Sequence, residues 1–267
     1  MPPKRPIRLV VLDLDGTTLS PDHQLNPATI AAIHEATVQG VRVVLASGRL
    51  PKSILPFAHA LGLDGVHLGL NGGVAFGSDG NLLHKHILNP EQLRFAYQVF
   101  ADRGWEPVIF TAHDIVSQGD SEGARLLLAL GEPEVLNYQP EQLDSIVDPV
   151  KVLAILDAGP TDAMIAAQVA GRLVSIRSGP RFFELMAPGV SKGAALAELL
   201  ADWGIAKDET LAVGDSENDE SLFDATGFAV AMGNAVPALK AKADFVTASN
   251  ADDGVALALH DFVLSIR

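Results

Sequence analysis

The chain has 267 residues, 48% of them apolar and 19% charged, so it can bury a sizeable core and a disordered chain is excluded. This length suits one large domain or two of ordinary size. The formal net charge of −14 opposes the phosphates of DNA and RNA, which disfavours nucleic acid as the main partner. A small anionic substrate stays compatible with that charge, because a metal ion and a few cations can reverse the local field.

Cysteine content and the lack of targeting patterns exclude further kinds of protein. The chain has no cysteine, so disulfides and thiolate metal sites are excluded. No apolar stretch reaches the ~18 residues that a membrane span needs. The basic residues 1–6 run directly into a strand pattern, without the apolar region or cleavage site of a signal peptide. We therefore expect a cytoplasmic protein with no membrane partner, as a monomer or a weak homo-oligomer.

The first 84 residues alternate between strand and helix patterns. Short runs rich in Val, Leu and Ile predict buried strands at residues 7–12, 41–46 and 66–70. One helix is predicted to begin at Asn26-Pro27, an N-cap followed by proline at the first helical position, and another occupies about residues 53–61. This βαβαβ order predicts a parallel sheet with right-handed crossovers.

The middle of the chain has a different pattern. A helix is predicted after Asn89-Pro90, and strand-like stretches alternate with segments rich in Gly and Pro at residues 107–110, 150–156, 173–177 and 182–186. The α/β alternation resumes with a helix at residues 192–203 and strands at 210–213 and 228–232, and Asp252-Asp253 is predicted to cap the last helix. The fold class is therefore α/β: a parallel-sheet core from residues 1–84 and 188–267, with an α+β domain at 85–187 inserted.

Two carboxylates follow the first predicted strand. Asp13 and Asp15 are two residues apart, so strand geometry points both toward one site, and Gly16 permits a sharp turn there. Carboxylates at a buried strand end are costly to desolvate unless a cation or hydrogen bonds compensate them. The pair suits a Mg²⁺-assisted phosphoryl acceptor, although these residues alone are equally compatible with an acidic turn of no chemical role.

Further polar side chains follow other strand ends or begin helices: Ser47, Lys192, Asp215, Asn218 and Asp219. Ligands of open parallel sheets bind at the carboxyl ends of the strands, so these groups are expected to converge although they lie far apart in sequence. Their chemistry suits phosphoryl transfer. A carboxylate can be a nucleophile, a second can move protons, a hydroxyl beside backbone N–H groups can hold phosphoryl oxygens, and a lysine can neutralise charge.

Each residue can be given a role on this basis. Asp13, at the strand end, is the candidate nucleophile, and Asp15 is the candidate acid/base. Ser47 would hold the phosphoryl oxygens and Lys192 would neutralise charge. Mg²⁺ prefers hard oxygen ligands, and the plausible set is Asp13, the main-chain carbonyl of Asp15, and Asp215, with Asp219 and Asn218 in support.

Four motifs resemble, in order, those of the haloacid dehalogenase superfamily: DLDGT at 13–17, ASGR at 46–49, GVSKG at 189–193 and GDSEND at 214–219. The large insertion between the second and third motifs is similar to that of Cof-type phosphatases with a type IIB cap. The resemblance spans essentially the whole chain. It implies that residues 85–187 form this cap and that the rest forms the Rossmann-like core of the superfamily.

The resemblance also implies an activity and its residues. It implies a Mg²⁺-dependent phosphatase that hydrolyses small phosphorylated metabolites, with sugar phosphates as the expected class, through an aspartyl-phosphate. In that scheme Asp13, Asp15 and Lys192 are catalytic, and Ser47, Gly48 and Asn218 hold the phosphoryl group. The magnesium ligands would come from Asp13, Asp15, Asp215 and Asp219, where Asp219 positions Lys192 or a metal-bound water.

Three further residues are candidates for substrate binding, and each has a structural alternative. Arg49 starts a helix, where arginines are usually solvated. Asn71 stands in an Asn-Gly pair, which is also a strong turn signal. Glu184 is the one charged residue in an otherwise apolar predicted strand, next to the return to the core, and could contact the leaving group.

Two other functions use similar residues. A phosphomutase of hexose phosphates would share every catalytic residue and return the phosphoryl group to the substrate. A non-enzymatic phospho-receiver also combines an acidic cluster, Mg²⁺ and a lysine at parallel strand ends. It needs neither an acid/base such as Asp15 nor a large cap, so the phosphatase is favoured.

Overall fold

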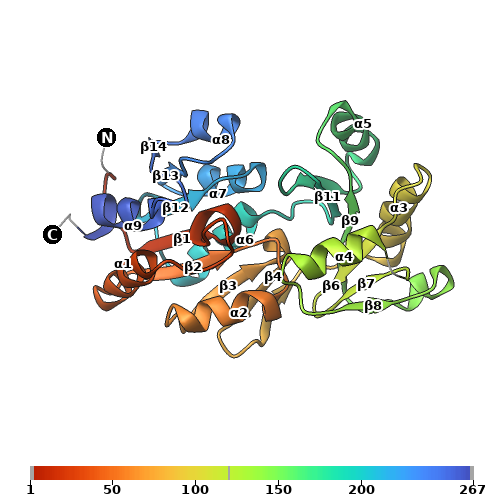
Figure 1. Cartoon of the computed structure of the whole chain (residues 1–267), viewed down its shortest axis with the longest axis horizontal. Helices are drawn as coiled ribbons and strands as arrows, with labels where there is room; N and C mark the ends of the chain where they lie inside the picture. The colour runs from red at the N-terminus through yellow and green to blue at the C-terminus, as the bar shows by residue number, and fades with distance from the viewer. Residues whose placement is uncertain (1–2, 120, 265–267) are drawn as a thin grey trace.

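The computed structural model describes residues 3–119 and 121–264, which form two β-sheets side by side (Figure 1). The larger sheet has eight strands in the order β14-β13-β12-β1-β2-β3-β4-β5. Strands β14 through β3 run parallel, whereas β4 and β5 pair antiparallel at one edge. The strands are β1 (Leu9–Asp13), β2 (Arg42–Ala46), β3 (Val66–Gly69), β4 (Val74–Gly77), β5 (Leu82–Lys85), β12 (Thr210–Gly214), β13 (Phe228–Ala231) and β14 (Phe245–Val246). The predicted α/β fold with a parallel-sheet core is confirmed.

Helices cover both faces of this sheet. They are α1 (Pro27–Val38), α2 (Pro51–Ala60), α6 (Lys192–Trp203), α7 (Glu220–Ala225), α8 (Pro237–Lys242) and α9 (Gly254–Leu259). Right-handed crossovers place α1 and α2 on one face and α7 and α8 on the other. Helix α9 packs on α1, and α6 packs on α7, which completes the two layers. In the part of the chain that the structure describes, no helix is long and apolar enough to cross a membrane.

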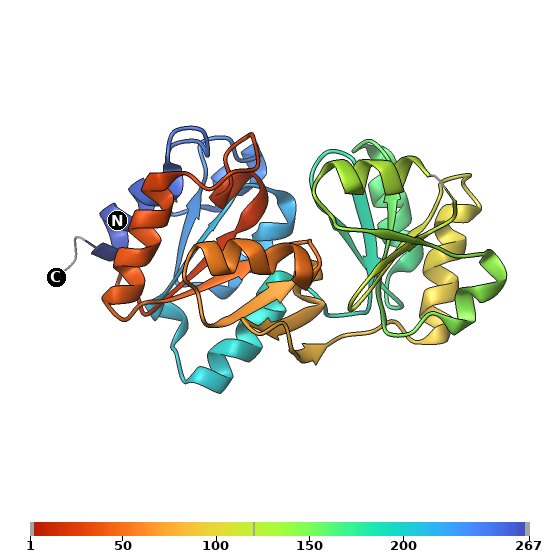
Figure 2. The same cartoon turned by 60° about the horizontal axis from the view of Figure 1, so that its bottom comes forward.

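The smaller sheet has six strands in the order β10-β11-β9-β6-β7-β8, all from the middle of the chain. Its strands are β6 (Val108–Thr111), β7 (Ile115–Ser117), β8 (Val135–Asn137), β9 (Pro149–Ile155), β10 (Val174–Arg177) and β11 (Phe182–Met186), and its helices are α3 (Pro90–Ala101), α4 (Glu122–Ala129) and α5 (Pro160–Val169). Figure 2 shows it as a second lobe, joined to the first by two connections. The predicted boundary after residue 84 falls inside β5, so we propose that the inserted domain begins after Lys85.

Alternation along the strands gives the smaller sheet two different faces. Ile109, Val152 and Phe183 point toward α3 and α5 and form an apolar core of their own. The neighbouring Phe110 and Leu153 belong instead to the large cluster that also fills the eight-stranded sheet. One face of the inserted sheet is therefore turned toward the first lobe, and this arrangement positions the candidate site between the two sheets.

Two predicted helix caps have other partners. Asn26 precedes α1 and Asp253 precedes α9, as expected for N-caps, but neither side chain caps its own helix. The Asn26 amide instead donates a 3.0 Å hydrogen bond to the Asp253 carboxylate. The packing of α1 against α9 brings the two side chains together, and they bond to each other instead of to their helix ends.

Candidate active site

The registers of three parallel strands bring the predicted residues to one edge of the larger sheet. Asp13 at the end of β1 pairs with Ala46 on β2, so Ser47 comes directly after that position. On the other side, Leu12 pairs with Val213 on β12, and Asp215 follows two residues later. The convergence expected from the sequence is therefore observed, because parallel strands in register end at the same edge.

A buried lysine joins two of the carboxylates. Lys192, the first residue of α6, donates hydrogen bonds of 2.6 Å to Asp13 Oδ1 and 2.7 Å to Asp219 Oδ1. The Lys192 and Asp219 side chains are 0% exposed, and the Asp13 side chain is 7% exposed. The second Asp219 oxygen accepts the backbone N–H groups of Asp215 and Ser216. Both Asp219 oxygens are thus occupied within the protein, which fits a residue that positions Lys192.

The cluster holds more negative charge than Lys192 can compensate. Burial raises the pKa of Asp13 well above its usual range, and the charges of Asp219 and Asp215 raise it further despite the opposing effect of Lys192. Burial and then the charge of Asp219 raise the pKa of Asp215 to about 6. Carboxylate oxygens of Asp13, Asp215 and Asp219 lie within 4.8 Å of one another. Such a set of hard oxygen donors, short of positive charge, fits Mg²⁺.

The loop after β1 is packed tightly onto Asp215. Thr17 Oγ1 donates a 3.0 Å hydrogen bond to Asp215 Oδ1. Gly16 has a φ of 79°, and a Cβ atom there would lie 2.5 Å from Asp215 Oδ2. Only glycine therefore allows this loop both its left-handed turn and its closeness to the carboxylate.

Arg49 contacts the candidate acid/base. Its Nε and Nη2 donate hydrogen bonds of 2.7 and 2.6 Å to the two Asp15 oxygens, and His23 Nδ1 lies 3.4 Å from Asp15 Oδ1. The backbone N–H of Arg49 donates to Ser47 Oγ. The structural alternative, a solvated arginine, does not hold for Arg49, because this two-point contact keeps the side chain in the site, where only 11% of it is exposed.

A chain of hydrogen bonds connects the two lobes. Asn218 Nδ2 donates to Asn71 Oδ1 at 2.9 Å, and Asn71 Nδ2 donates to Glu184 Oε2 at 2.7 Å. Glu184 Oε1 accepts a 2.9 Å hydrogen bond from Lys151 Nζ, which also donates to the Gly48 carbonyl. Asn71 and Glu184 are therefore linked to each other, and Asn71 takes part in more than a turn.

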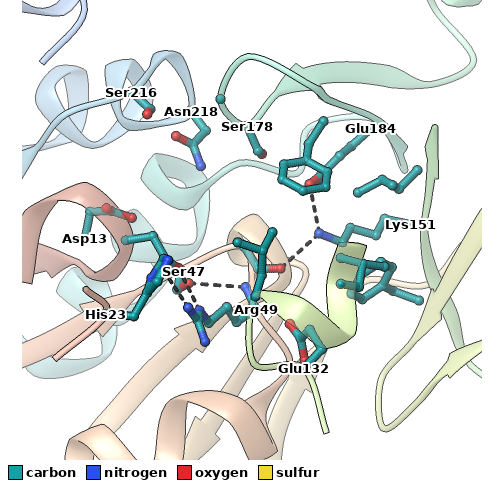
Figure 3. A pocket seen from close by; sticks show the side chains of 18 residues that line it. Asp13, His23, Ser47, Arg49, Glu132, Lys151, Ser178, Glu184, Ser216 and Asn218 are labelled. Atoms are coloured by element: carbon teal, nitrogen blue, oxygen red, sulfur yellow. Dashed lines mark hydrogen bonds and ion pairs between the residues drawn. The ribbon is translucent and has the colours of Figure 1, made fainter. Parts of the chain in front are cut away.

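These residues surround one cavity of about 850 Å³, including the part that is open to solvent. Figure 3 shows Asp13, Ser47 and Arg49 on one side and Lys151 and Glu184 on the other. Asp15, Gly48 and Asn218 also line the cavity, whereas Lys192, Asn71, Asp215 and Asp219 do not line it and contact its wall through hydrogen bonds or packing. The structure thus brings together every residue proposed from the sequence.

Sequence analysis missed two charged residues of the cavity wall. Lys151 interrupts the apolar strand β9, which is the same signal that identified Glu184 in β11, and it could have been recognised in the same way. Glu132 lies in the loop after α4, and its carboxylate accepts hydrogen bonds from the Leu50 N–H and the Ser53 hydroxyl in the other lobe. Nothing in its local sequence, Gly-Glu-Pro-Glu, indicates that contact.

The chain belongs to the haloacid dehalogenase-like hydrolase family, which matches residues 10–259. This match confirms the family that the four motifs predicted, and with it an enzyme of the hydrolase class. The chain is 28% identical to the 5-amino-6-(5-phospho-D-ribitylamino)uracil phosphatase YcsE of Bacillus subtilis, over 97% of this chain and 96% of that one. It is 30% identical to the phosphoglycolate phosphatase of Methanoculleus marisnigri, over 93% of each.

A solved structure supports the same assignment. A haloacid dehalogenase-like hydrolase from Bacteroides thetaiotaomicron is 29% identical, with a TM-score of 0.83 over 96% of this chain and 99% of that one. The similarity extends over both lobes, so the inserted sheet belongs to the shared fold and is no peculiarity of this chain.

Proposed function

We propose that the protein is a Mg²⁺-dependent phosphatase that hydrolyses small phosphorylated metabolites through an aspartyl-phosphate on Asp13. The observation that carries this proposal is the placement of Asp13 between Lys192, which bonds to one of its oxygens, and a cavity that Asp15 also lines. A nucleophilic carboxylate with a charge partner and a second carboxyl group beside it is the minimum that a two-step phosphoryl transfer requires.

In the first step an oxygen of Asp13 forms a bond to phosphorus while the bond from phosphorus to the alcohol oxygen breaks. Protonated Asp15 gives its proton to that oxygen, so the alcohol leaves neutral. Arg49 orients the Asp15 carboxyl through its two hydrogen bonds. Ser47 and the N–H groups that follow it, together with Asn218, are placed to hold the phosphoryl oxygens.

In the second step Asp15 accepts a proton from water, and the water oxygen bonds to phosphorus. The bond from phosphorus to Asp13 breaks, which releases inorganic phosphate and restores the carboxylate. Before the reaction Lys192 keeps a positive charge beside Asp13, because the charges of Asp13 and Asp219 outweigh the burial that would otherwise lower its pKa. Asp219 holds that lysine in place.

The metal would be held by Asp13, Asp215 and the main-chain carbonyl of Asp15. When bound, Mg²⁺ supplies positive charge to the phosphoryl oxygens. Gly16 and Thr17 fix Asp215 for this purpose, the first by close packing and the second by a hydrogen bond. Asp219 would act beside the metal by holding Lys192, to which one of its oxygens is bonded, while the other accepts backbone N–H groups.

The substrate is a small phosphate monoester. The cavity is large enough for a small metabolite. A relative whose name specifies a phosphorylated ribityl chain supports the sugar-phosphate class expected from the family resemblance. The inserted lobe completes the cavity wall, so it would exclude bulk water and contact the alcohol part of the substrate.

The test is release of inorganic phosphate from a panel of sugar and other small-metabolite phosphates, with Mg²⁺ or with chelator. We expect release that requires the metal and is lost in Asp13→Asn, which replaces the nucleophilic carboxylate with an amide of nearly the same shape. Asp208→Asn is the matched control, since Asp208 pairs with Arg5 on the surface, and it should behave as wild type. Near-normal release from Asp13→Asn would contradict the proposal. Formation of an isomeric sugar phosphate in place of free phosphate would indicate a mutase.

A further inference from the structure

The cavity wall that the inserted lobe contributes is mainly apolar. Five side chains form its apolar part: Phe110, Leu127, Leu130, Leu153 and Phe182. Phe110, Leu153 and Phe182 come from strands β6, β9 and β11 of the inserted sheet, and the two leucines come from α4 and the residue after it. This wall lines the same cavity as Asp13 and Asp15, so the alcohol part of a phosphate ester bound at Asp13 would project toward it.

The apolar wall follows from the strand pattern. Side chains two residues apart share a face, so Leu153 lies on the same face of β9 as Lys151, and Phe182 on the same face of β11 as Glu184. The residues between them, Val152 and Phe183, point into the core under α3 and α5. The cavity face of the sheet therefore carries one buried ion pair, with apolar side chains around it.

The charged groups on this wall already have hydrogen-bond partners within the protein. Lys151 donates to Glu184 and to the Gly48 carbonyl, and its ammonium lies 4.3 Å from the centre of the Phe110 ring. Glu184 accepts from Lys151 and Asn71, one bond on each oxygen. A substrate hydroxyl on this wall would therefore share groups whose charge is already compensated by buried partners, and it would gain little from them.

Glu132 and Ser178 complete the polar side chains of this wall. Each oxygen of Glu132 already accepts a bond from the first lobe. Ser178 Oγ accepts a 2.8 Å hydrogen bond from Asn71 and so keeps its own proton to donate. Among the described residues of this wall, Ser178 is the one that presents a hydroxyl. The several hydroxyls of a bare sugar would lie mainly against apolar side chains here, which is unfavourable.

We propose that the inserted lobe selects phosphate esters whose alcohol carries an apolar ring, aromatic or alicyclic, with Phe182 and Leu153 as specificity-determining residues. This inference rests on the phosphatase function proposed above and names the substrate class of the same site. It departs from the sugar-phosphate expectation for one physical reason: the wall buries apolar surface well and solvates hydroxyls poorly.

The test compares esters of similar leaving-group acidity, so that only the body of the alcohol differs. Benzyl phosphate and cyclohexylmethyl phosphate are primary-alcohol esters with an apolar ring, and glucose 6-phosphate is a primary-alcohol ester with hydroxyls. With Mg²⁺ present, kcat/KM for the two ring esters should exceed that for glucose 6-phosphate at least tenfold. An equal or higher value for glucose 6-phosphate overturns the inference and leaves the phosphatase function intact.

Two variants test whether the apolar wall causes the preference for ring esters. Phe182→Thr removes the ring at the first residue of β11, and the ratio of kcat/KM for benzyl phosphate to that for glucose 6-phosphate should fall about tenfold. Phe245→Thr makes the same change at the first residue of β14, at the edge of the other sheet. It should leave the ratio at the wild-type value. An unchanged ratio in Phe182→Thr would overturn the role of this residue.

Binding provides a readout that does not require turnover. Benzylphosphonate and the matching phosphonate of glucose can be titrated into wild-type protein with Mg²⁺ in a calorimeter. Tighter binding of benzylphosphonate, by about tenfold, supports the inference even if no ester is hydrolysed. A lack of hydrolysis would contradict only the proposed function. Equal or weaker binding of benzylphosphonate would overturn it.

Discussion

Gly16 connects the two halves of the candidate site at the scale of a single residue. It follows Asp15 in the chain and packs on Asp215, which follows a different strand. Its φ of 79° is strained for any residue with a Cβ atom. Gly40 has a φ of 85° but no atom within 4 Å of the place where its Cβ would be. Substitution at these two glycines therefore distinguishes the effect of backbone strain, which both would show, from the effect of close contact, which only Gly16 would show.

We expect Gly16→Ala to lower kcat/KM by at least about 100-fold, because its methyl group would push Asp215 away from Asp13. Gly40→Ala should cost about 1 kcal/mol of unfolding free energy through strain alone and leave activity unchanged. Phosphate release and urea denaturation of both variants provide the measurement. Equal activity in the two variants would contradict the assignment of Asp215.

The polar cluster could be predicted from the sequence because several of its residues stand at the ends of buried strands, where a polar side chain is costly to desolvate without a partner. Asp13, Ser47 and Asp215 all follow apolar strands. The partners of these residues could not be predicted in the same way. The contact of Arg49 with Asp15 and that of Glu132 with the start of α2 depend on where a loop or an inserted lobe lies in space.

At the scale of elements, a buried histidine makes the central sheet sensitive to acid. His67 lies on β3 with 0% exposure, and its Nδ1 accepts the backbone N–H of Leu45 on β2. Burial lowers the pKa of His67 to about 4. An unfolded histidine titrates near pH 6.5, so between these values the unfolded chain binds a proton that the folded chain does not. The contribution of His67 to the free energy of unfolding is therefore fully present above pH 6.5 and is lost as the pH falls toward 4.

This effect should amount to about 3 kcal/mol of unfolding free energy between pH 7 and pH 4. We expect His67→Asn, whose amide oxygen can still accept the Leu45 N–H, to be less stable at neutral pH but to lose less on acidification. His34→Asn is the control, since His34 is exposed on α1 and its loss should leave the wild-type slope. Urea denaturation across this pH range measures all three proteins. Parallel slopes in wild type and His67→Asn would refute the assignment.

The elements with strong local signals were the ones predicted well. Helix α6 and strand β11 have the predicted bounds. A serine caps the start of α6 and a glycine in the left-handed conformation follows its end, whereas an apolar run defines β11. The short strands β7 and β8 and the helix α4 were not predicted. Three residues are too few to show a period, and the sheet that these strands join stabilises them from outside the segment.

At the scale of the whole molecule, the inserted lobe lies closed over the first lobe. Glu132 is central to this contact, since its carboxylate satisfies donors at the N-terminus of α2, where the N-cap residue Leu50 has no side chain able to do so. Lys151 and Glu184 add the bonds to Gly48 and Asn71. Polar contacts thus add to the apolar packing between the lobes, and they can break and re-form when substrate enters.

We expect Glu132→Ala to favour the open arrangement. The radius of gyration measured by small-angle X-ray scattering should increase, and kcat/KM should fall about five- to tenfold, chiefly through a higher KM. Glu134→Ala, two residues further along in an exposed position, should match wild type in both measurements. If Glu132→Ala has the radius and the KM of wild type, Glu132 does not hold the lobes together.

How the two lobes meet could not be predicted from the sequence. An insertion with both strand and helix patterns was predicted from the segments between the second and third motifs. Which face of its sheet turns toward Asp13 is fixed by pairs such as Lys151 with Gly48, about 100 residues apart along the chain. Sequence periodicity reports on faces within one element and contains no information about which distant element will cover them.

The account depends on a covalent bond between Asp13 and the phosphoryl group, and rapid-quench kinetics tests that bond most directly. Asp15→Asn should be mixed with Mg²⁺ and p-nitrophenyl phosphate, whose leaving group needs no proton from the enzyme. We predict a burst of one p-nitrophenolate per active site, slow turnover after it, and one phosphoryl group on Asp13 in the acid-quenched protein. Steady release without a burst, or a phosphoryl group on any other residue, would contradict Asp13 as the nucleophile.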